Sequence, residues 1–347
     1  MSHSSIPAEL LHATGVEPAV LGRDFESLAG PMPISGTARG EASIRTVLEN
    51  IRSGKYRFEL VPCPCGASGR DIVLARVDRY RLPHRSVLCG ACGLSRTSPR
   101  LDSASYIDFY ANHYRAIYER PGDSAANLID RQQANARRRY DLVQRSAPRP
   151  PRSVVELGCA AGWNLFPHRD AGCRVEGYDY DHNYLDAGRA RGLAMHHGGV
   201  EEALAAGNRF DLVILSHVVE HMLDPGSEVG RICGLLEPGG LVFIEVPSIL
   251  AAGHPLLRYF QSAHTFSFCP ETLTDTLRAS RLSPIHLDAS VASIWQLEDA
   301  ASSRDLKGTP ELGQRILDHL TGIRPPSRVR QVAHMVRQRL GIGSSRP

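Results

Sequence analysis

An apolar segment that stops abruptly at a glycine-rich turn, Val154–Gly162, constrains the fold of this chain more than any other stretch. The run Val154-Val155-Glu156-Leu157 is typical of a short buried strand, and Gly158 can adopt backbone angles that other residues avoid. Gly162 lets a helix begin close to the turn. A strand, a tight turn and a helix in this order predict an α/β unit whose turn leaves bare backbone for a ligand.

Strand-like and helix-like segments alternate from this turn to about residue 298. Buried apolar runs separated by helices predict a parallel sheet with helices on both faces. The expected strands are Ser153–Leu157, Arg174–Tyr178, Leu193–His196, Phe210–Leu215 and Leu241–Val246, with two more within Ser283–Gln296. The expected helices are His182–Arg191, Pro225–Leu236 and Glu271–Ala279.

The residues of the glycine turn discriminate between two classes of nucleotide cofactor. Dinucleotides favour the spacing Gly-x-Gly-x-x-Gly, in which a helix N-terminus faces a pyrophosphate. This chain instead has Glu156-x-Gly158-x-x-x-Gly162, with alanine at position 160. The Glu156 carboxylate would repel a pyrophosphate, whereas it suits a cofactor that carries an ammonium group and a sulfonium. The turn therefore favours S-adenosylmethionine over NAD.

A second acidic residue, Asp179, ends the next predicted strand, about 20 residues after the turn. A carboxylate at this position can accept hydrogen bonds from both ribose hydroxyls. The alternative is that Asp179 caps the following helix, but Asp181 is better placed for that role. Together, Glu156 and Asp179 predict a site for a nucleoside cofactor.

Five sequence features occur in the order typical of class I S-adenosylmethionine-dependent methyltransferases, which the chain resembles over about Val154–Leu297. They are Glu156–Gly162, Asp179, Phe210–Val213, His217–His221 and Leu236–Gly240. The resemblance implies a Rossmann-like, doubly wound sheet of seven strands. It also implies that Glu156 and the glycine turn surround the methionine part of the cofactor. The chain is most similar to the branch that modifies sugars and small molecules, which includes O-methyltransferases of ubiquinone biosynthesis.

One position departs from the family pattern. The family often has an aspartate near the adenine amine after the third strand, whereas this chain reads Gly198-Gly199-Val200-Glu201-Glu202. We expect backbone and apolar contacts to hold the adenine, with Glu201 as a candidate substitute for the aspartate. The predicted cofactor-binding residues are Glu156, Gly158, Cys159, Ala160, Gly162, Asp179, Tyr180, Glu201 and Ser216.

The string His217-x-x-Glu220-His221 allows several roles. On a helix the two histidines could bind zinc, as in an inverted zinc-protease motif, but the preceding buried strand and cofactor turn argue against this interpretation. Glu220 and His221 could brace the loop, or His217 could be a general base for an acceptor hydroxyl. By resemblance, some ubiquinone-type O-methyltransferases bind a divalent cation through an acid-x-x-Glu-His string. Histidine at the first position disfavours such a Mg²⁺ site.

His264 lies in the insertion before the last predicted helix and is a second candidate base. Methyl transfer is an in-line displacement at carbon, in which alignment and exclusion of water supply much of the acceleration. A base assists when the acceptor is a hydroxyl and is required when it is a carbon acid. The predicted catalytic residues are His217, Glu220 and His264.

Four of the eight cysteines form two tight pairs, Cys63-Pro64-Cys65 and Cys89-Gly90-Ala91-Cys92. Four thiolates on two turns predict a closed, tetrahedral structural zinc site, and nearby glycines allow backbone amides to point at sulfur. The first pair is C-x-C rather than C-x-x-C, which departs from the zinc ribbon that this segment resembles. The alternative is a set of reduced cysteines without a metal. Similar ribbons precede a branch of sugar methyltransferases.

Composition narrows the class of protein further. The chain of 347 residues has no apolar run approaching the roughly 20 residues of a membrane span, and we expect no secretory signal. The other cysteines are scattered singly, which indicates a reducing compartment, the cytoplasm by default. The net charge of +3 demands neither nucleic acid nor an anionic membrane as partner. Arg137, Arg138 and Arg139 are expected on a solvated helix face, and the alternative is that they face an anionic ligand or a lipid surface.

The predicted organisation has five parts. They are an undefined extension (1–55), a zinc-ribbon-like module (56–100), a helical lead-in (101–150), a methyltransferase domain (151–298) and a helical, peripheral tail (299–347). The predicted function is methylation of a small-molecule acceptor, a sugar or glycan precursor, at oxygen or carbon.

The alternatives are an O-methyltransferase acting on a quinone-like phenol, a zinc-ribbon protein that binds or modifies RNA, and a pseudoenzyme. The near-neutral charge argues against RNA, and the intact Glu156, glycine turn and Asp179 argue against a pseudoenzyme. The acceptor, the methylated atom and the oligomeric state stay open.

Overall fold

The computed structural model describes residues 37–118, 125–251, 259–298 and 308–323. The chain forms two compact units, which we call the cysteine unit and the sheet unit. The cysteine unit comprises Met1–Pro121, Ile249–Phe268 and Leu306–Pro347, and the sheet unit comprises Gly122–Ser248 and Cys269–Asp305. Predictions for residues 1–36 and for the tail beyond residue 323 lie outside the described residues. Among the described residues we find no helix with the length and hydropathy of a membrane span.

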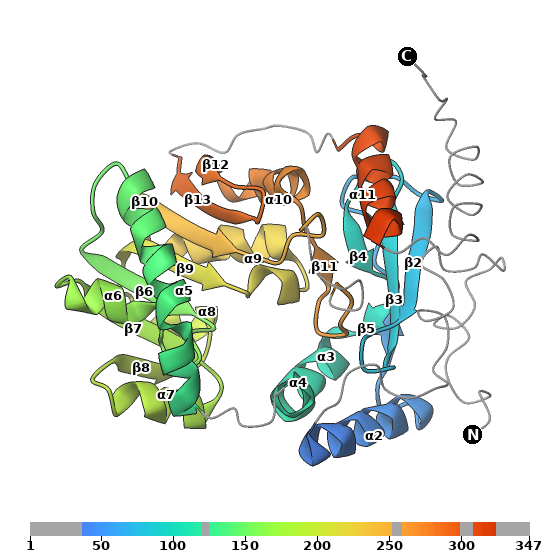
Figure 1. Ribbon diagram of the computed structural model, residues 1–347, viewed down its shortest axis with the longest axis horizontal. Helices are drawn as coiled ribbons and strands as arrows, with labels where there is room; N and C mark the ends of the chain where they lie inside the picture. Colours follow the sequence, from blue (N-terminus) through green and yellow to red (C-terminus); the bar gives the residue numbers. More distant parts are fainter. Residues whose placement is uncertain (1–36, 119–124, 252–258, 299–307, 324–347) are drawn as a thin grey trace. The chain divides into compact units, whose positions relative to one another are not determined.

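The sheet unit contains a seven-stranded sheet (Figure 1). Its strands are β6 (Ser153–Leu157), β7 (Arg174–Asp179), β8 (Ala194–His197), β9 (Phe210–Ser216), β10 (Leu236–Glu245), β12 (Leu282–Leu287) and β13 (Ala292–Leu297). Their spatial order is β12-β13-β10-β9-β6-β7-β8. Strands β8, β7, β6, β9 and β10 pair in parallel, and β13 lies antiparallel between β10 and β12. The predicted Rossmann-like sheet of seven strands is confirmed.

The direction in which successive strands are added reverses at β6. Strands β7 and β8 continue on one side of β6, and the chain then returns to place β9 and β10 on the other side. Ligands of open α/β sheets bind outside the carboxyl ends of the strands at such a switch point. The glycine turn follows β6 and the loop with His217 follows β9, so both lie at this edge of the sheet.

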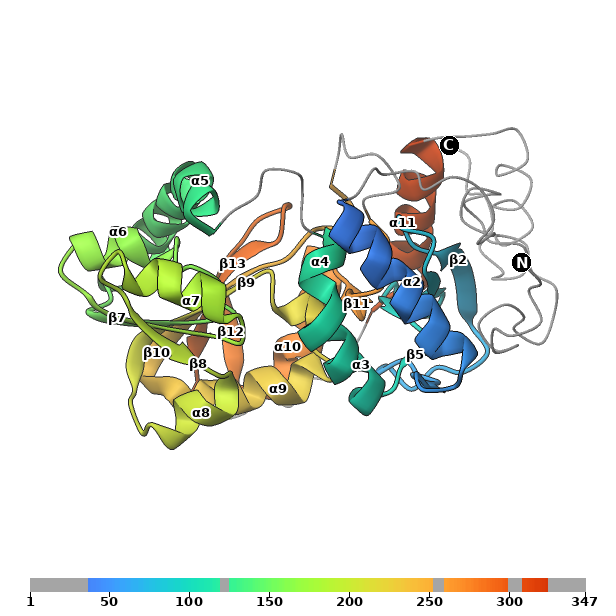
Figure 2. The ribbon, with the colours of Figure 1, turned by 90° about the horizontal axis from the view of Figure 1, so that it is seen from below.

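Helices cover both faces of this sheet (Figure 2). One face carries α5 (Ala125–Ser146), α6 (Leu165–Asp170) and α7 (His182–Arg189), and the other carries α8 (Val200–Ala205), α9 (Pro225–Ile232) and α10 (Pro270–Leu277). Helix α9 ends earlier than predicted, because the chain tightens into the 3-10 helix η5 (Cys233–Leu235) before β10 begins. Asp181 caps α7, as predicted, since its side chain accepts hydrogen bonds from the Asn183 and Tyr184 amides.

Alternating strand residues build the core of the sheet unit. Val154, Leu212 and Phe243, from three neighbouring strands, are at most 1% exposed. Successive side chains of a strand point to opposite faces, so each inner strand needs apolar residues at nearly every position. These three belong to one apolar cluster with Leu165 of α6 and Leu185 of α7. Their burial fixes the sheet edge that carries the glycine turn.

The cysteine unit is built on a four-stranded antiparallel sheet in the order β11-β4-β3-β2. Its strands are β2 (Asp71–Val77), β3 (Pro83–Cys89), β4 (Ser95–Thr97) and β11 (Phe266–Ser267), and a separate pair joins β1 (Phe58–Glu59) to β5 (Arg100–Leu101). Its helices are α2 (Ala38–Arg52), α3 (Ser103–Phe109), the π-helix η3 (Tyr110–Tyr114), α4 (Arg115–Tyr118) and α11 (Pro310–Ile323). Strand β11 comes from the insertion after β10, far from β4 in the sequence.

Helix α11 belongs to the core of the cysteine unit. Its residues Leu312, Ile316 and Leu320 are buried, and a Cβ added to Gly93 would lie 2.8 Å from Leu312 Cγ. The helical prediction for this part of the tail is confirmed, but the prediction that it is peripheral is wrong. Its apolar face recurs every three to four residues, which is the period of a helix packed on a core.

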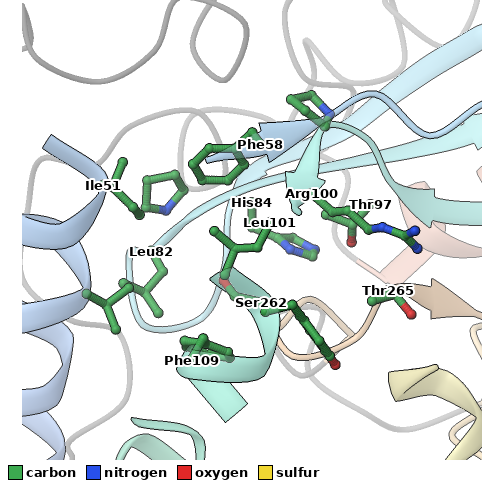
Figure 3. A pocket seen from close by; sticks show the side chains of 14 residues that line it. Ile51, Phe58, Leu82, His84, Thr97, Arg100, Leu101, Phe109, Ser262 and Thr265 are labelled. Carbon is green, nitrogen blue, oxygen red and sulfur yellow. The ribbon is translucent and has the colours of Figure 1, made fainter. Parts of the chain in front are cut away.

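An apolar hollow in the cysteine unit contains a buried histidine, His84 (Figure 3). Ile51, Leu82 and Phe109 contribute to its lining. The His84 Nδ1 atom is buried and has no hydrogen-bond partner among the described residues. Burial lowers the pKa of His84 to about 3, because a charged imidazole would lose its hydration there. His84 is therefore neutral in the folded protein at neutral pH.

We expect His84 to destabilise the protein as the pH falls below 6.5. The unfolded chain binds a proton below its pKa of 6.5, whereas the folded chain does not until about 3. The free energy of unfolding is therefore unaffected by His84 above pH 6.5, and it falls progressively between pH 6.5 and about pH 3. Between pH 7 and pH 5, His84→Leu should lose about 2 kcal/mol less free energy of unfolding than the wild type. Urea unfolding at both pH values measures this difference, and equal losses would contradict it.

Candidate active site

The glycine turn between β6 and α6 contains three residues with positive φ: Gly158 at 66°, Ala160 at 47° and Gly162 at 74°. A Cβ on Gly158 would lie 2.8 Å from Val218 Cγ2, so this position also lacks room for a side chain. Positive φ is unfavourable for alanine, and such strain tends to occur at functional sites. The turn therefore places strained backbone at the switch point of the sheet, where Gly158 is exposed and residues 159–162 are buried.

Asp179 lies at the end of β7, beside this turn. Its Oδ2 accepts a hydrogen bond from the Ala160 amide at 2.8 Å, and its Oδ1 accepts one from the Asp181 amide at 2.9 Å. Cys159, between Gly158 and Ala160 in the turn, is buried, and its amide donates a hydrogen bond to the Tyr178 carbonyl at 3.1 Å. The structure thus brings together the turn and the acid that the sequence singled out. The role of Asp179 at a ribose stays a prediction.

Glu156 is buried at the end of β6 and has one satisfied and one unsatisfied oxygen. Its Oε1 accepts a hydrogen bond from Asn164 Nδ2 at 2.6 Å. Its Oε2 is buried and has no hydrogen-bond partner among the described residues. Burial raises the pKa of Glu156 to about 8, helped by the charge of Asp179 and opposed by Asn164 and Arg139. A buried acceptor without a donor is costly, so Oε2 is suited to a ligand that brings its own N–H group.

Arg139 and Glu245, which were not selected from the sequence, complete this cluster. Arg139 Nη1 donates to Asn164 Oδ1 at 3.0 Å, and its Nε and Nη2 donate to the two Glu245 oxygens, each at 3.1 Å. The prediction that Arg137–Arg139 lie on a solvated face is wrong for Arg139, which is only 7% exposed. The helical period could have predicted the burial of Arg139, because this residue lies three residues after Ala136 and four before Val143, which are both buried.

Two arginines hold Glu245 in its ionised form. Burial favours the neutral carboxyl, but the hydrogen bonds and charge of Arg139, the charge of Arg138 and that of His217 outweigh it, and the pKa of Glu245 is lowered. Arg138 Nη2 reaches both Glu245 oxygens, at 2.9 and 2.8 Å. Glu245 is therefore a fixed negative charge at the end of β10.

His217 follows β9 in a loop and lies between two carboxylates. Its Nδ1 is 3.4 Å from Glu220 Oε1, its Nε2 is 3.9 Å from Glu245 Oε1, and its φ is 58°. Half of its side chain is exposed, so an acceptor could reach the imidazole. The following residues form the 3-10 helix η4 (Val219–His221) rather than the α-helix that the zinc-protease interpretation requires. The interpretation of this string as a helical zinc site therefore finds no support in the backbone.

Three further predicted residues lie on neighbouring elements of the sheet unit. Tyr180, after β7, is 61% exposed. Glu201, in the first turn of α8, forms an ion pair with Arg231 of α9. Ser216 ends β9 and pairs with Glu245 in the sheet. Their predicted contacts with a cofactor stay predictions.

His264 lies in the cysteine unit. Its carbonyl accepts a hydrogen bond from Thr97 Oγ1 at 2.8 Å, and its ring contacts the Gln261 side chain. The side chain is largely buried. Its proposed role as a base stays a prediction.

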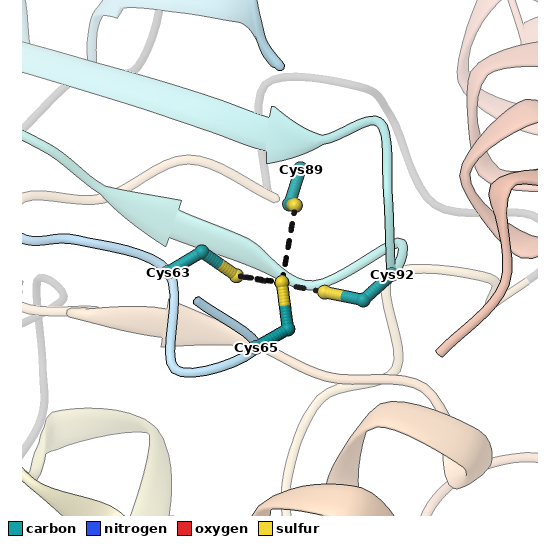
Figure 4. Close-up of side chains that lie close together, drawn as sticks. All are labelled: Cys63, Cys65, Cys89 and Cys92. Atoms are coloured by element: carbon teal, nitrogen blue, oxygen red, sulfur yellow. Dashed lines mark hydrogen bonds between the residues drawn. The ribbon is translucent and has the colours of Figure 1, made fainter. Parts of the chain in front are cut away.

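The four clustered cysteines converge in the cysteine unit (Figure 4). The sulfur–sulfur distances are 3.3 Å for Cys63–Cys65, 3.5 Å for Cys63–Cys92 and 3.7 Å for Cys65–Cys89. Sulfurs bound tetrahedrally to zinc at about 2.3 Å are about 3.8 Å apart. The C-x-C spacing of the first pair therefore does not prevent the four sulfurs from converging to a size that fits this ion.

Hydrogen bonds within the cluster shift the pKa values of its thiols in opposite directions. Hydrogen bonds from Cys63 and Cys92 lower the pKa of the Cys89 thiol, and the backbone amides of Ala91 and Cys92 lower it further. The hydrogen bond to Cys89 raises the pKa of Cys63 to about 12, because the crowded cluster resists a second negative charge. A bound cation would remove this resistance and release protons.

Comparison with known proteins identifies the class of enzyme. Residues 129–283, which include the glycine turn, Asp179 and His217, match the family profile described as a methyltransferase domain. A ubiquinone biosynthesis O-methyltransferase from Ralstonia nicotianae is 29% identical over 192 residues, which are 53% of this chain and 79% of that protein. Residues 129–283 thus form a methyltransferase domain, and the protein is an S-adenosylmethionine-dependent methyltransferase.

Other relatives match shorter parts of this methyltransferase. A ubiquinone biosynthesis O-methyltransferase from a Methylobacterium species is 35% identical over 97 residues, which are 26% of this chain and 39% of that protein. The methyltransferase thus spans well under half the length of this relative. Among solved structures, the 1,6-didemethyltoxoflavin-N1-methyltransferase of Burkholderia thailandensis, with bound S-adenosylhomocysteine, gives a TM-score of 0.45 at 17% identity. That match covers 59% of this chain and 96% of the other.

Proposed function

We propose that this methyltransferase modifies the oxygen or carbon of a small-molecule acceptor, a sugar or glycan precursor. The observation that carries the cofactor part of the proposal is the buried, unsatisfied Oε2 of Glu156 at the switch point of the sheet. S-adenosylmethionine fits it, because its ammonium group supplies the missing donor. When bound, the cofactor would supply a methyl group on a sulfonium; the acceptor would attack this methyl carbon in line, and the carbon–sulfur bond would break to release S-adenosylhomocysteine.

Each residue around the site has a separate role in this proposal. Glu156 would hold the ammonium end, the glycine turn would leave room for the methionine part, and Asp179 would accept hydrogen bonds from the ribose hydroxyls. His217 accepts the proton of an acceptor hydroxyl, and Glu220 orients the imidazole through the contact at Nδ1, 3.4 Å away. His264 is the second candidate for the base.

A quinone-like phenol is the second candidate acceptor. The names of the Ralstonia and Methylobacterium relatives favour it, since both are ubiquinone biosynthesis O-methyltransferases. His217 provides nitrogen where some such enzymes have an acid, so we expect no dependence on Mg²⁺. Formation of S-adenosylhomocysteine with a catechol and with nucleotide-linked sugars, each with and without a chelator, separates the candidates. Turnover with the catechol alone would replace the sugar proposal.

We also propose that Cys63, Cys65, Cys89 and Cys92 bind one structural zinc ion. The converging sulfurs support this proposal, and four thiolates leave no coordination position open for a substrate. The chain packs tightly against the cluster at Gly308, where an added Cβ would collide with Cys92. The ion would therefore hold the fold of the cysteine unit rather than take part in methyl transfer.

Calorimetry with S-adenosylhomocysteine and then with NAD tests the cofactor proposal. We expect the first ligand to bind with a dissociation constant of about micromolar size and the second not to bind, because Glu156 attracts an ammonium and repels a pyrophosphate. Binding of NAD in preference to S-adenosylhomocysteine would refute the proposal.

We expect the affinity for S-adenosylhomocysteine to fall as the pH drops below about 8. The folded protein holds a proton on Glu156 below a pKa of about 8, and the ammonium of the ligand binds the deprotonated carboxylate. Binding at pH 7 should therefore release a proton, and the affinity should fall by about tenfold for each further pH unit. Calorimetry in two buffers with different heats of ionisation measures both effects. A constant affinity from pH 6 to pH 9 would contradict this prediction.

A further inference from the structure

We propose that Arg139 is a positioning residue for the cofactor site. It holds Glu156 through Asn164. Through Glu245, it also connects Glu156 to His217. The proposal rests on the proposed function of Glu156. It adds a residue outside the glycine turn to the cofactor-binding machinery, contributed by helix α5.

Arg139 determines which way the Asn164 amide faces. A guanidinium only donates hydrogen bonds, so the Asn164 atom 3.0 Å from Arg139 Nη1 must be the amide oxygen. The amide nitrogen then faces Glu156 and donates to Oε1 at 2.6 Å. Without Arg139 the amide could turn and present its oxygen to the carboxylate, which would repel it or require a proton on Glu156. The arginine thus keeps Oε1 satisfied and leaves Oε2 for the ammonium.

The charge of Arg139 also favours the ionised carboxylate. Two charged groups act on Glu156 within this site: Arg139 from α5 lowers its pKa, and Asp179 from β7 raises it. Asn164 contributes a neutral donor from the start of α6. Removing the arginine leaves the negative charge of Asp179 unopposed in a buried site, so Glu156 would hold its proton to higher pH. The protein would then bind an ammonium less well at neutral pH.

The opposite end of the arginine fork fixes the loop that carries His217. Arg139 binds both Glu245 oxygens, and the Glu245 backbone carbonyl accepts the His217 amide at 2.8 Å. One buried guanidinium therefore ties α5 to the end of β10 and to the residue proposed to accept the proton. A lysine would keep the charge but could not form both ends of this bridge.

Three variants test the proposal by calorimetry with S-adenosylhomocysteine at pH 7 and pH 9. Arg139→Gln should bind about tenfold more weakly at pH 7 and only about twofold more weakly at pH 9, where Glu156 is ionised without help. Arg139→Lys should bind about twofold more weakly at both pH values, because it loses the fork as Arg139→Gln does but keeps the charge. The matched control is Arg137→Gln, on the same helix, whose side chain is 67% exposed and pairs with Asp141. It should bind like the wild type.

The outcomes separate this proposal from the proposed function. A wild type that fails to bind S-adenosylhomocysteine would overturn the function itself. If the wild type binds and Arg139→Gln shows an equal loss at both pH values, or none, the arginine does not position Glu156. Should Arg139→Gln not fold, Asn164→Ala removes the link but keeps the Arg139–Glu245 pair. It should reproduce the loss confined to lower pH, and a uniform loss would overturn the proposal.

Discussion

Replacing Glu156 with glutamine should reduce the affinity for S-adenosylhomocysteine by about a hundredfold or more. Glutamine has the same shape and can still accept the hydrogen bond that Asn164 donates to Oε1 at 2.6 Å. It removes the negative charge that we propose the ligand ammonium requires. Because the site is buried, water cannot replace this charge. The loss should therefore exceed that of any other single substitution proposed for the cofactor site.

A carboxylate on the neighbouring strand provides the control for this prediction. Glu176, on β7, is also buried and accepts hydrogen bonds from Arg174 at 2.6 Å and from Asn208 at 3.2 Å. Glu176→Gln should bind S-adenosylhomocysteine as the wild type does. Calorimetry on both variants decides the matter. An affinity of Glu156→Gln within about threefold of the wild type would remove Glu156 from the proposed site.

Glu156→Gln should not destabilise the ligand-free protein. The folded-state pKa of Glu156, about 8, lies above the ordinary value of 4.5, so the folded chain holds an extra proton between these values. The stability linked to this proton is complete below pH 4.5 and is lost as the pH rises through 8. Glu156→Gln removes this loss, so its free energy of unfolding should equal or exceed that of the wild type at pH 8. A site that costs stability but binds a ligand is typical of function.

Replacing Cys92 with serine should remove the zinc and unfold the cysteine unit. The metal content should fall from about one ion per chain to near zero, with a loss of several kcal/mol in the free energy of unfolding, because structural zinc contributes directly to folding. Three of the four cysteines are buried, so a cluster without its ion would leave crowded thiols in the interior. Elemental analysis and thermal unfolding measure the two effects.

A cysteine outside the cluster provides the control. Cys173, in the sheet unit, is partly buried, and its sulfur donates to the Pro151 carbonyl at 3.2 Å. Cys173→Ser should keep the metal content and most of the stability of the wild type. Purified wild-type protein without any bound metal would refute the zinc proposal, as would a Cys92→Ser variant that unfolds at the wild-type temperature.

The parts of this protein that could be predicted from its sequence are those whose chemistry is local. A strand that ends at Gly158, an acid that ends the next strand and a pair of cysteines on one turn each place their groups within a few residues. Strong apolar runs also located the strands β6 and β9, because burial on both faces demands apolar side chains at nearly every position. The order of strand and helix then placed Glu156 and Asp179 at one edge of the sheet.

The tertiary structure alone decided which distant groups meet. Arg139 stands in a run of three arginines, and only the packing of α5 separates it from exposed Arg137 and brings it to Asn164. Strand β11 and helix α11 belong to the cysteine unit, although segments of the sheet unit separate them in the sequence from the rest of that unit. No local sequence pattern predicts this. The physical reason is that a side chain's burial and partners depend on surfaces brought together by folding. The sequence by itself determined the strands, the glycine turn and the candidate cofactor acids, whereas packing determined the network that holds them.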